Sequence, residues 1–113
     1  MNDWEAAAQA ALDKKAEDVI ILNIGKVSSL TGYFVLATGT NARQTQAIAE
    51  AIRDALRERG LRPLGVEGMQ QGEWILLDYG DFLVHVFSPE KRKFYDLERL
   101  WSNAPRTVIS EAA

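Results

Sequence analysis

The turn Thr38-Gly39-Thr40-Asn41 is the first stretch whose residues could do chemistry. It joins an apolar run to a helical pattern, and free backbone N–H groups at the start of a helix can hold a phosphate, as a small nucleotide-binding or nucleotidyl-transfer enzyme would require. The same residues also form an ordinary helix cap, because Asn41 and Gln44 have the spacing of a capping pair. Both interpretations fit the sequence, and the cap is the simpler one.

Two pairs of carboxylates could serve the same chemistry, since phosphoryl transfer uses acidic side chains to hold a divalent metal. Asp78 and Asp81 stand on either side of a Tyr-Gly turn, and Asp96 and Glu98 are two positions apart. Residues two apart on a helix point to different faces, so Asp96 and Glu98 cannot share an ion. Neither pair makes a convincing metal site, and we predict no metal and no cofactor.

His85 is the only histidine, so acid–base catalysis would rest on it, with Asp78, Asp81 or Glu73 as its neighbour. The chain has no cysteine, and a single histidine cannot build a zinc site. No serine or threonine lies in a nucleophile-elbow sequence. A histidine in the middle of a strand more often has a structural or interface role, so we predict that the protein is not an enzyme.

The stretch that positions His85 is residues 72–87, where two apolar runs flank Tyr79-Gly80 as in a β-hairpin. A two-residue turn at Tyr79-Gly80 would pair Trp74 with His85. Side chains alternate between the two faces of a strand, so the register decides which residues share a face. A slip of one residue would exchange the two faces.

The two faces of this hairpin differ in character. One carries an ordinary apolar core set, namely Ile75, Leu77, Phe82, Val84 and Val86. The other carries a mixed set, namely Trp74, Leu76, Asp78, Asp81, Leu83, His85 and Phe87. A mixture of this kind centred on a tryptophan is typical of protein-binding surfaces. The alternative is that a second helix of the same domain covers this face.

The remaining segments predict an α+β fold with a single mixed β-sheet flanked by helices. Helices are expected from Asn2 to about Lys15, over 42–59 and after Ser88-Pro89-Glu90, buried strands at 19–24 and 33–38, and an edge strand at 62–66. The first helix has a thin apolar stripe, so we expect it to pack peripherally. Phe94, Leu97 and Trp101 should line one face of the last helix. We expect one domain over residues 1–102 and a flexible C-terminal tail over 103–113.

Composition limits the possible partners. The chain has 113 residues, 47% of them hydrophobic and 26% charged, which is typical of one soluble globular domain. The net charge of −3 favours a basic protein partner over nucleic acid. Lys91-Arg92-Lys93 is either an RNA-binding cluster or a solvated helix face. No apolar run reaches the roughly 20 residues that cross a bilayer, so we expect no membrane contact and a cytoplasmic protein.

Taken together, these stretches resemble the ribosomal silencing factor family, also called the Iojap family. The similarity covers residues 18–20, 28–29, 33–40, 60–68, 73–81, 85–87 and 94–101, in the order of the family. It includes Gly60-Leu61-Arg62-Pro63-Leu64-Gly65-Val66-Glu67-Gly68 and Phe94-Tyr95-Asp96-Leu97-Glu98-Arg99-Leu100-Trp101. One departure is Gly32, where the family usually has an acidic residue immediately before the strand.

The resemblance implies a translation repressor with a nucleotidyltransferase-like fold that lacks the catalytic acids. Members of the family bind the large ribosomal subunit through ribosomal protein L-fourteen. They sterically block joining of the small subunit, which lowers protein synthesis under nutrient limitation or in stationary phase. Contact with ribosomal RNA would be peripheral, no small-molecule substrate is implied, and a homodimer of the free protein is plausible because an exposed apolar face can self-associate.

The resemblance also implies which residues bind the partner. Trp74 matches the hairpin tryptophan of the family and would be the central anchor. The expected binding set is Trp74, Leu76, Asp78, Leu83, His85, Tyr95, Asp96 and Glu98, with the last three as polar contacts at the rim.

Overall fold

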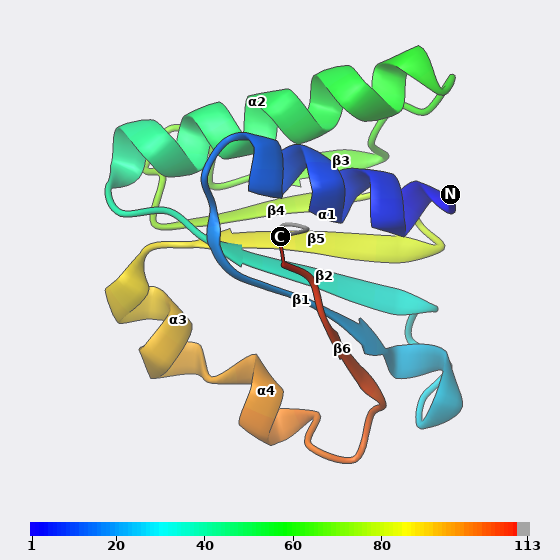
Figure 1. Ribbon diagram of the computed structural model, residues 1–113. Coiled ribbons are helices and arrows are strands. Elements are labelled where there is room, and N and C mark those ends of the chain that lie inside the picture. Colours follow the sequence, from blue (N-terminus) through cyan, green and yellow to red (C-terminus); the bar gives the residue numbers. More distant parts are fainter. Residues whose placement is uncertain (111–113) are drawn as a thin grey trace.

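The computed structural model describes residues 1–110 as a six-stranded sheet with helices on both faces (Figure 1). The elements in chain order are α1 (Asp3–Asp13), β1 (Glu17–Asn23), the short 3-10 helix η1 (Ile24–Lys26), β2 (Tyr33–Thr38), α2 (Ala42–Glu58), β3 (Gly65–Glu67), β4 (Trp74–Asp78), β5 (Phe82–Phe87), α3 (Pro89–Tyr95), α4 (Leu97–Leu100) and β6 (Arg106–Val108). None of these helices is long and apolar enough to span a membrane.

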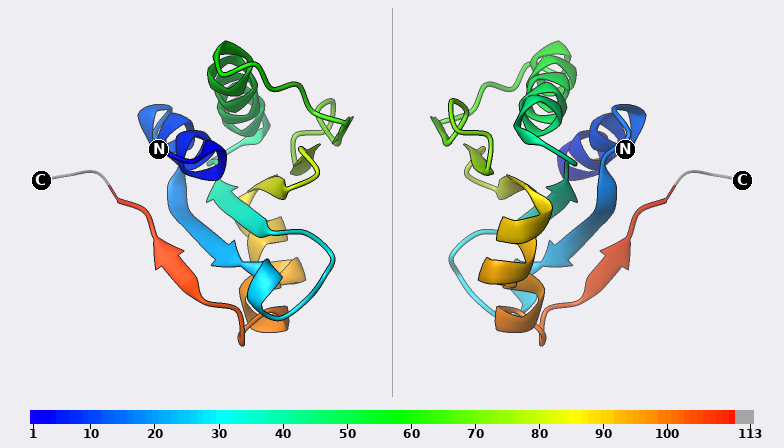
Figure 2. Two further views of the ribbon diagram at one scale, coloured as in Figure 1. Left: turned by 90° about the vertical axis from the view of Figure 1, so that its right-hand side faces the viewer. Right: turned by 90° about the vertical axis from the view of Figure 1, so that its left-hand side faces the viewer.

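The sheet has the strand order β3-β4-β5-β2-β1-β6 and is mixed. Strands β2 and β5 pair in parallel at its centre, and every other neighbouring pair is antiparallel. Helices α1 and α2 lie on one side, and α3 and α4 on the other (Figure 2). Both faces of β1 and β2 are therefore covered, which explains why their sequences are almost continuously apolar. The expected fold class is confirmed.

The β4–β5 hairpin forms, but its register differs from the predicted one. Trp74 pairs with Phe87, and His85 pairs with Leu76. The turn lies one residue further along the chain than predicted, because the N–H of Tyr79 donates to the carbonyl of Phe82 at 3.0 Å, with Gly80 and Asp81 between them. The shift from the predicted pairing is an even number of residues, so each side chain keeps its predicted face.

Helix α1 packs more deeply than its thin stripe predicts. Its capping pair forms as expected, with the backbone N–H of Asn2 donating to Glu5 Oε1 at 2.8 Å. Most of its interior-facing residues are small, and the buried ones are Ala6, Ala7, Ala8, Ala10, Ala11 and Leu12. Alanine leaves room for close approach of neighbouring backbones, so α1 packs into the same core as α2 and the sheet. The prediction of peripheral packing is wrong.

The C-terminal segment adds a strand to the sheet, and its hydrogen bonds to β1 extend to Ile109. Strand β6 pairs antiparallel with β1. The N–H of Asn23 donates to the carbonyl of Pro105 at 2.8 Å, and the N–H of Ile109 donates to Val19 at 2.9 Å. Ala104 is buried. The domain boundary expected at residue 102 is therefore too early, because β6 pairs with the outer edge of β1. Residues 111–113 of the expected tail lie outside the described residues.

Ending the chain after Ser102 should destabilise the domain by about 2 kcal/mol, because several backbone hydrogen bonds of about 1 kcal/mol each are lost along β1. Urea denaturation followed by circular dichroism would measure the change. The matched control is Val108→Thr, which alters an exposed side chain and keeps the strand backbone. A truncated protein as stable as the full chain would show that β6 does not support the sheet.

Candidate protein-docking site

The segment after β5 folds as two short helices instead of the single helix expected from the sequence. Ser88 caps α3, its Oγ accepting from the N–H of Lys91 at 3.2 Å. Helix α3 stops at Asp96, which has left-handed backbone angles of φ 48° and ψ 54°, and α4 follows directly. Aspartate is one of the few residues that visit this region readily. The break changes the helical phase, so Phe94 does not share the face of Leu97.

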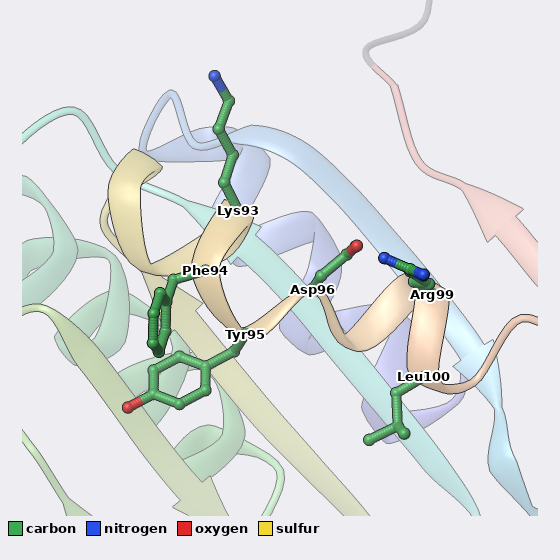
Figure 3. A pocket seen from close by; sticks show the side chains of 6 residues that line it. All are labelled: Lys93, Phe94, Tyr95, Asp96, Arg99 and Leu100. Atoms are coloured by element: carbon green, nitrogen blue, oxygen red, sulfur yellow. The ribbon is translucent and has the colours of Figure 1, made fainter.

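The break leaves three large apolar side chains in solvent. Phe94 is 75% exposed, Leu100 70% and Tyr95 41%, whereas Leu97 is buried. The exposed residues surround an open hollow of about 530 Å³ between α3 and α4, which is also lined by Lys93, Asp96 and Arg99 (Figure 3). Phe94 and Leu100 are not among the binding residues predicted from the sequence, because a continuous helix would turn Phe94 inward.

Trp74 connects this hollow to the hairpin. Its ring centroid lies 4.4 Å from that of Tyr95 and 5.2 Å from that of Phe87, on which it stacks. Leu76 and Leu83 are half-buried on the same face of β4 and β5. We call the surface formed by Trp74, Leu76, Leu83, Phe94, Tyr95 and Leu100 the docking face. The structure thus brings together most of the apolar residues of the expected binding set.

His85 lies behind this surface. It is only 4% exposed, and its Nδ1 accepts a hydrogen bond from Trp74 Nε1 at 3.1 Å. Phe34 packs edge-on against its ring with a centroid distance of 4.6 Å. His85 therefore holds the indole of Trp74 in place and is itself largely shielded from a partner. Burial, and secondarily the positive charge of Arg92, lower the pKa of His85 to about 4, so the ring is neutral at pH 7.

This lowered pKa makes stability depend on pH. The unfolded chain binds a proton at His85 below its ordinary pKa of about 6.5, whereas the folded protein does so only near pH 4. The stabilisation is complete above pH 6.5 and is lost as the pH falls towards 4, by about 3 kcal/mol in total at 1.36 kcal/mol per pKa unit.

Urea denaturation of wild type and His85→Phe at pH 7.0, 6.0 and 5.0 would measure this dependence. The wild type should lose stability between pH 6.5 and 5, a range in which most carboxylates stay ionised, and the variant should be flatter there. Parallel pH profiles of the two proteins would contradict the assignment, whatever their absolute stabilities.

Glu98 and Arg92 form an internal ion pair. Arg92 Nε donates to both carboxylate oxygens of Glu98 at 3.1 Å, and its Nη1 and Nη2 donate to Thr38 Oγ1 and to the carbonyl of Asp18. Glu98 is therefore committed within the domain, in contrast to its expected place at the rim. The expected cluster Lys91-Arg92-Lys93 is also divided, because Arg92 is buried and the Lys91 ammonium lies over the ring of Phe94.

Several of the groups that could serve catalysis are engaged in local structure. At the turn before α2, the N–H groups of Gly39, Thr40 and Gln44 donate to Phe87, Gln44 Oε1 and Asn41 Oδ1 respectively. The capping interpretation of this turn is thus confirmed at Asn41. Asp78 Oδ1 accepts from the N–H of Gly80 at 2.8 Å. Residues 1–110 contain no group of three acidic or histidine side chains placed to hold a metal ion.

Gly32 lies against the hairpin turn, and its N–H donates to the carbonyl of Asp81 at 3.0 Å. A Cβ added at Gly32 would lie only 2.7 Å from that carbonyl oxygen. An acidic side chain at this position would therefore require a shift of the Asp81 backbone. The absence of an acid here fits the close approach of the two segments.

Comparison with known proteins decides the family. The family described as "Ribosomal silencing factor during starvation" matches residues 2–113. The chain belongs to the ribosomal silencing factor family. Family membership places it among ribosome-associated regulators of translation, a role that suggests a non-enzymatic protein.

Relatives support the assignment over most of the chain. A ribosomal silencing factor of Bacillus subtilis is 41% identical over 99 residues, which cover 88% of this chain and 84% of that protein. One from Chromobacterium violaceum is 42% identical over 107 residues, covering 95% and 88%. A crystal structure of a Chromobacterium violaceum protein superposes with a TM-score of 0.84 at 38% identity, covering 100% of this chain and 97% of the other.

Proposed function

We propose that the protein represses translation by binding the large ribosomal subunit through ribosomal protein L-fourteen and blocking the joining of the small subunit. The proposal extends the family assignment to a specific partner and a steric mechanism. It places the contact on the docking face, with Trp74 as the central anchor. Repression would lower protein synthesis under nutrient limitation or in stationary phase.

The observation that carries the proposal is the exposure of large apolar side chains at one place. Phe94, Tyr95 and Leu100 project from α3 and α4 around one hollow, and Tyr95 lies against the half-buried indole of Trp74. Scattered apolar residues on a surface are ordinary, but a contiguous patch of aromatic and aliphatic groups is typical of a binding site for protein. Aromatic anchors at the centre of such a patch supply most of the binding energy.

Charge supports a basic partner on the hairpin side of the docking face. Asp78, Asp81 and Glu73 belong to the hairpin or flank it. Opposite charges across an interface speed association and fix orientation more than they add affinity. Asp78 and Asp96 would then act at the rim, and any contact with ribosomal RNA would be peripheral. A second copy of the chain could cover the same face when no ribosome is present.

Sedimentation through sucrose gradients tests the proposal. The protein is mixed with separated large subunits, with small subunits and with the reassociated particle. We expect it to sediment with large subunits alone and to reduce reassociation in proportion to its occupancy. Purified L-fourteen in excess should compete for binding. Failure to bind either subunit, or binding that leaves reassociation unaffected, would refute the mechanism.

A further inference from the structure

We infer that the hollow between α3 and α4 receives an apolar side chain of the docked protein, and that Lys93 and Arg99 pair with a carboxylate next to that side chain. The inference rests on the proposed docking function and specifies the chemistry of one partner segment. The hollow is the part of the docking face that α3 and α4 form (Figure 3).

The apolar walls of the hollow are continuous with the anchor. Phe94 stands edge-on to Tyr95 with a centroid distance of 5.0 Å, and Tyr95 packs on Trp74 at 4.4 Å. The three rings form one connected row from the hollow to the hairpin. Leu100 provides a further exposed apolar side chain at the α4 end of the hollow. A partner that covers Trp74 can therefore extend over Tyr95 into the hollow and bury Phe94 and Leu100 there.

The charged groups of the hollow are available to a partner. Within residues 1–110, the side chains of Lys93 and Arg99 take part in no ion pair, whereas Arg92 on the same segment is held by Glu98. The only acid lining the hollow is Asp96, whose side chain points towards Arg99 (Figure 3). Two cations and one anion leave a local excess of positive charge in a protein whose net charge is −3.

This local excess of positive charge determines where the partner should carry acidic and basic groups. The hairpin side of the docking face is acidic and the hollow is basic, so a partner binds best with basic groups near the hairpin and an acidic group at the hollow. A phosphate of RNA could also meet Lys93 and Arg99, but it could not bury Phe94 and Leu100. A partner segment with an apolar side chain and a neighbouring carboxylate can bury Phe94 and Leu100 and also pair with Lys93 and Arg99.

Affinity for isolated large subunits tests the inference with the full chain carrying a fluorescent label. Phe94→Ala should weaken binding about tenfold, because it removes an apolar contact outside the central anchor. The double variant Lys93→Glu/Arg99→Glu should also weaken it about tenfold, and its loss should shrink at high salt. Lys93→Arg/Arg99→Lys should retain near-wild-type affinity.

Matched controls lie elsewhere on the molecule. Leu30→Ala removes another exposed apolar side chain, and Lys14→Glu reverses a charge beside the groove of α1 and α2. Both should bind within about twofold of wild type. Circular dichroism melting curves would establish that each variant is folded, which is expected because the altered side chains are largely exposed.

The outcomes separate this inference from the function on which it rests. If the hollow variants bind like wild type while Trp74→Ala does not bind, the inference is wrong and the docking function stands. If wild type binds no subunit, both are wrong. If wild type binds a free RNA oligonucleotide and the charge-reversed protein does not, the hollow is a phosphate site and the inference is again wrong.

Discussion

Trp74→Ala should weaken binding to the large ribosomal subunit by about 30- to 1,000-fold, because truncating a central aromatic anchor typically costs about 2–4 kcal/mol of binding free energy. The indole packs on Tyr95 and Phe87 and is oriented by the hydrogen bond to His85. Removal of the indole leaves a gap between the hairpin and α3. The partner then loses its contact with the indole and meets a surface of a different shape. Fluorescence titration and sedimentation of the complex would measure the loss.

Two variants make the result specific. Trp4→Ala removes an indole of equal size that stacks on Tyr33 at 4.0 Å on the α1–α2 side of the sheet, so it should lower stability without affecting binding. Trp74→Phe keeps the stacking on Phe87 but loses the donor to His85, and an intermediate affinity is expected. Binding by folded Trp74→Ala within a few-fold of wild type would remove Trp74 from the centre of the interface.

Arg92→Met should lower the free energy of unfolding by about 3–5 kcal/mol, because breaking a buried ion pair leaves its partner without compensation. The guanidinium joins α3 to Glu98 of α4, to Thr38 of β2 and to the carbonyl of Asp18 in β1. The arginine and glutamate side chains are 9% and 23% exposed, so solvent cannot readily replace these bonds. Urea denaturation would measure the loss.

The matched control is Arg57→Met. Arg57 also pairs with a carboxylate, that of Asp54, but both side chains are more than half exposed. Such surface pairs contribute about 0–1 kcal/mol, so the control should change stability little. In the double variant Arg92→Met/Glu98→Gln, part of the loss should be recovered because no buried charge remains unpaired. Equal effects of Arg92→Met and Arg57→Met would show that the buried pair is not structurally important.

The regular elements could be predicted because local signals and burial agree. Strand β2 has the predicted limits, and Gly60, with φ of +85°, ends α2 as expected. The alternation of β4 and β5 is also predictable, even though the position of the turn is not. Strand β6 could not be inferred, since its short and exposed sequence has no apolar pattern and forms only because β1 offers an unpaired edge.

The docking face is predictable in part. Trp74, Leu76, Leu83 and Tyr95 can be recognised from the hairpin pattern and the family resemblance. The sequence predicts that His85 and Glu98 face a partner, but His85 is buried and bonded to Trp74 across the hairpin, and half-buried Glu98 is paired with Arg92. The sequence predicts that Phe94 faces the interior, which is wrong because α3 ends at Asp96. The left-handed backbone conformation that ends the helix there is not marked by any pattern in the sequence. Specific side-chain partners decide the cases of His85 and Glu98, and a single backbone conformation decides that of Phe94.

The parallel pairing of β2 with β5 has a consequence for the order in which the chain folds. The β1–β2 and β4–β5 pairs are each close in sequence, whereas β2 and β5 are separated by α2, β3 and β4. Such non-local pairing slows folding, to times on the order of milliseconds to seconds in proteins rich in it. Arg92 of α3 can bond to β1 and β2 only after β5 has paired with β2. A half-assembled chain can therefore display the hairpin, but it cannot yet hold α3 and α4 in the arrangement that a partner would recognise.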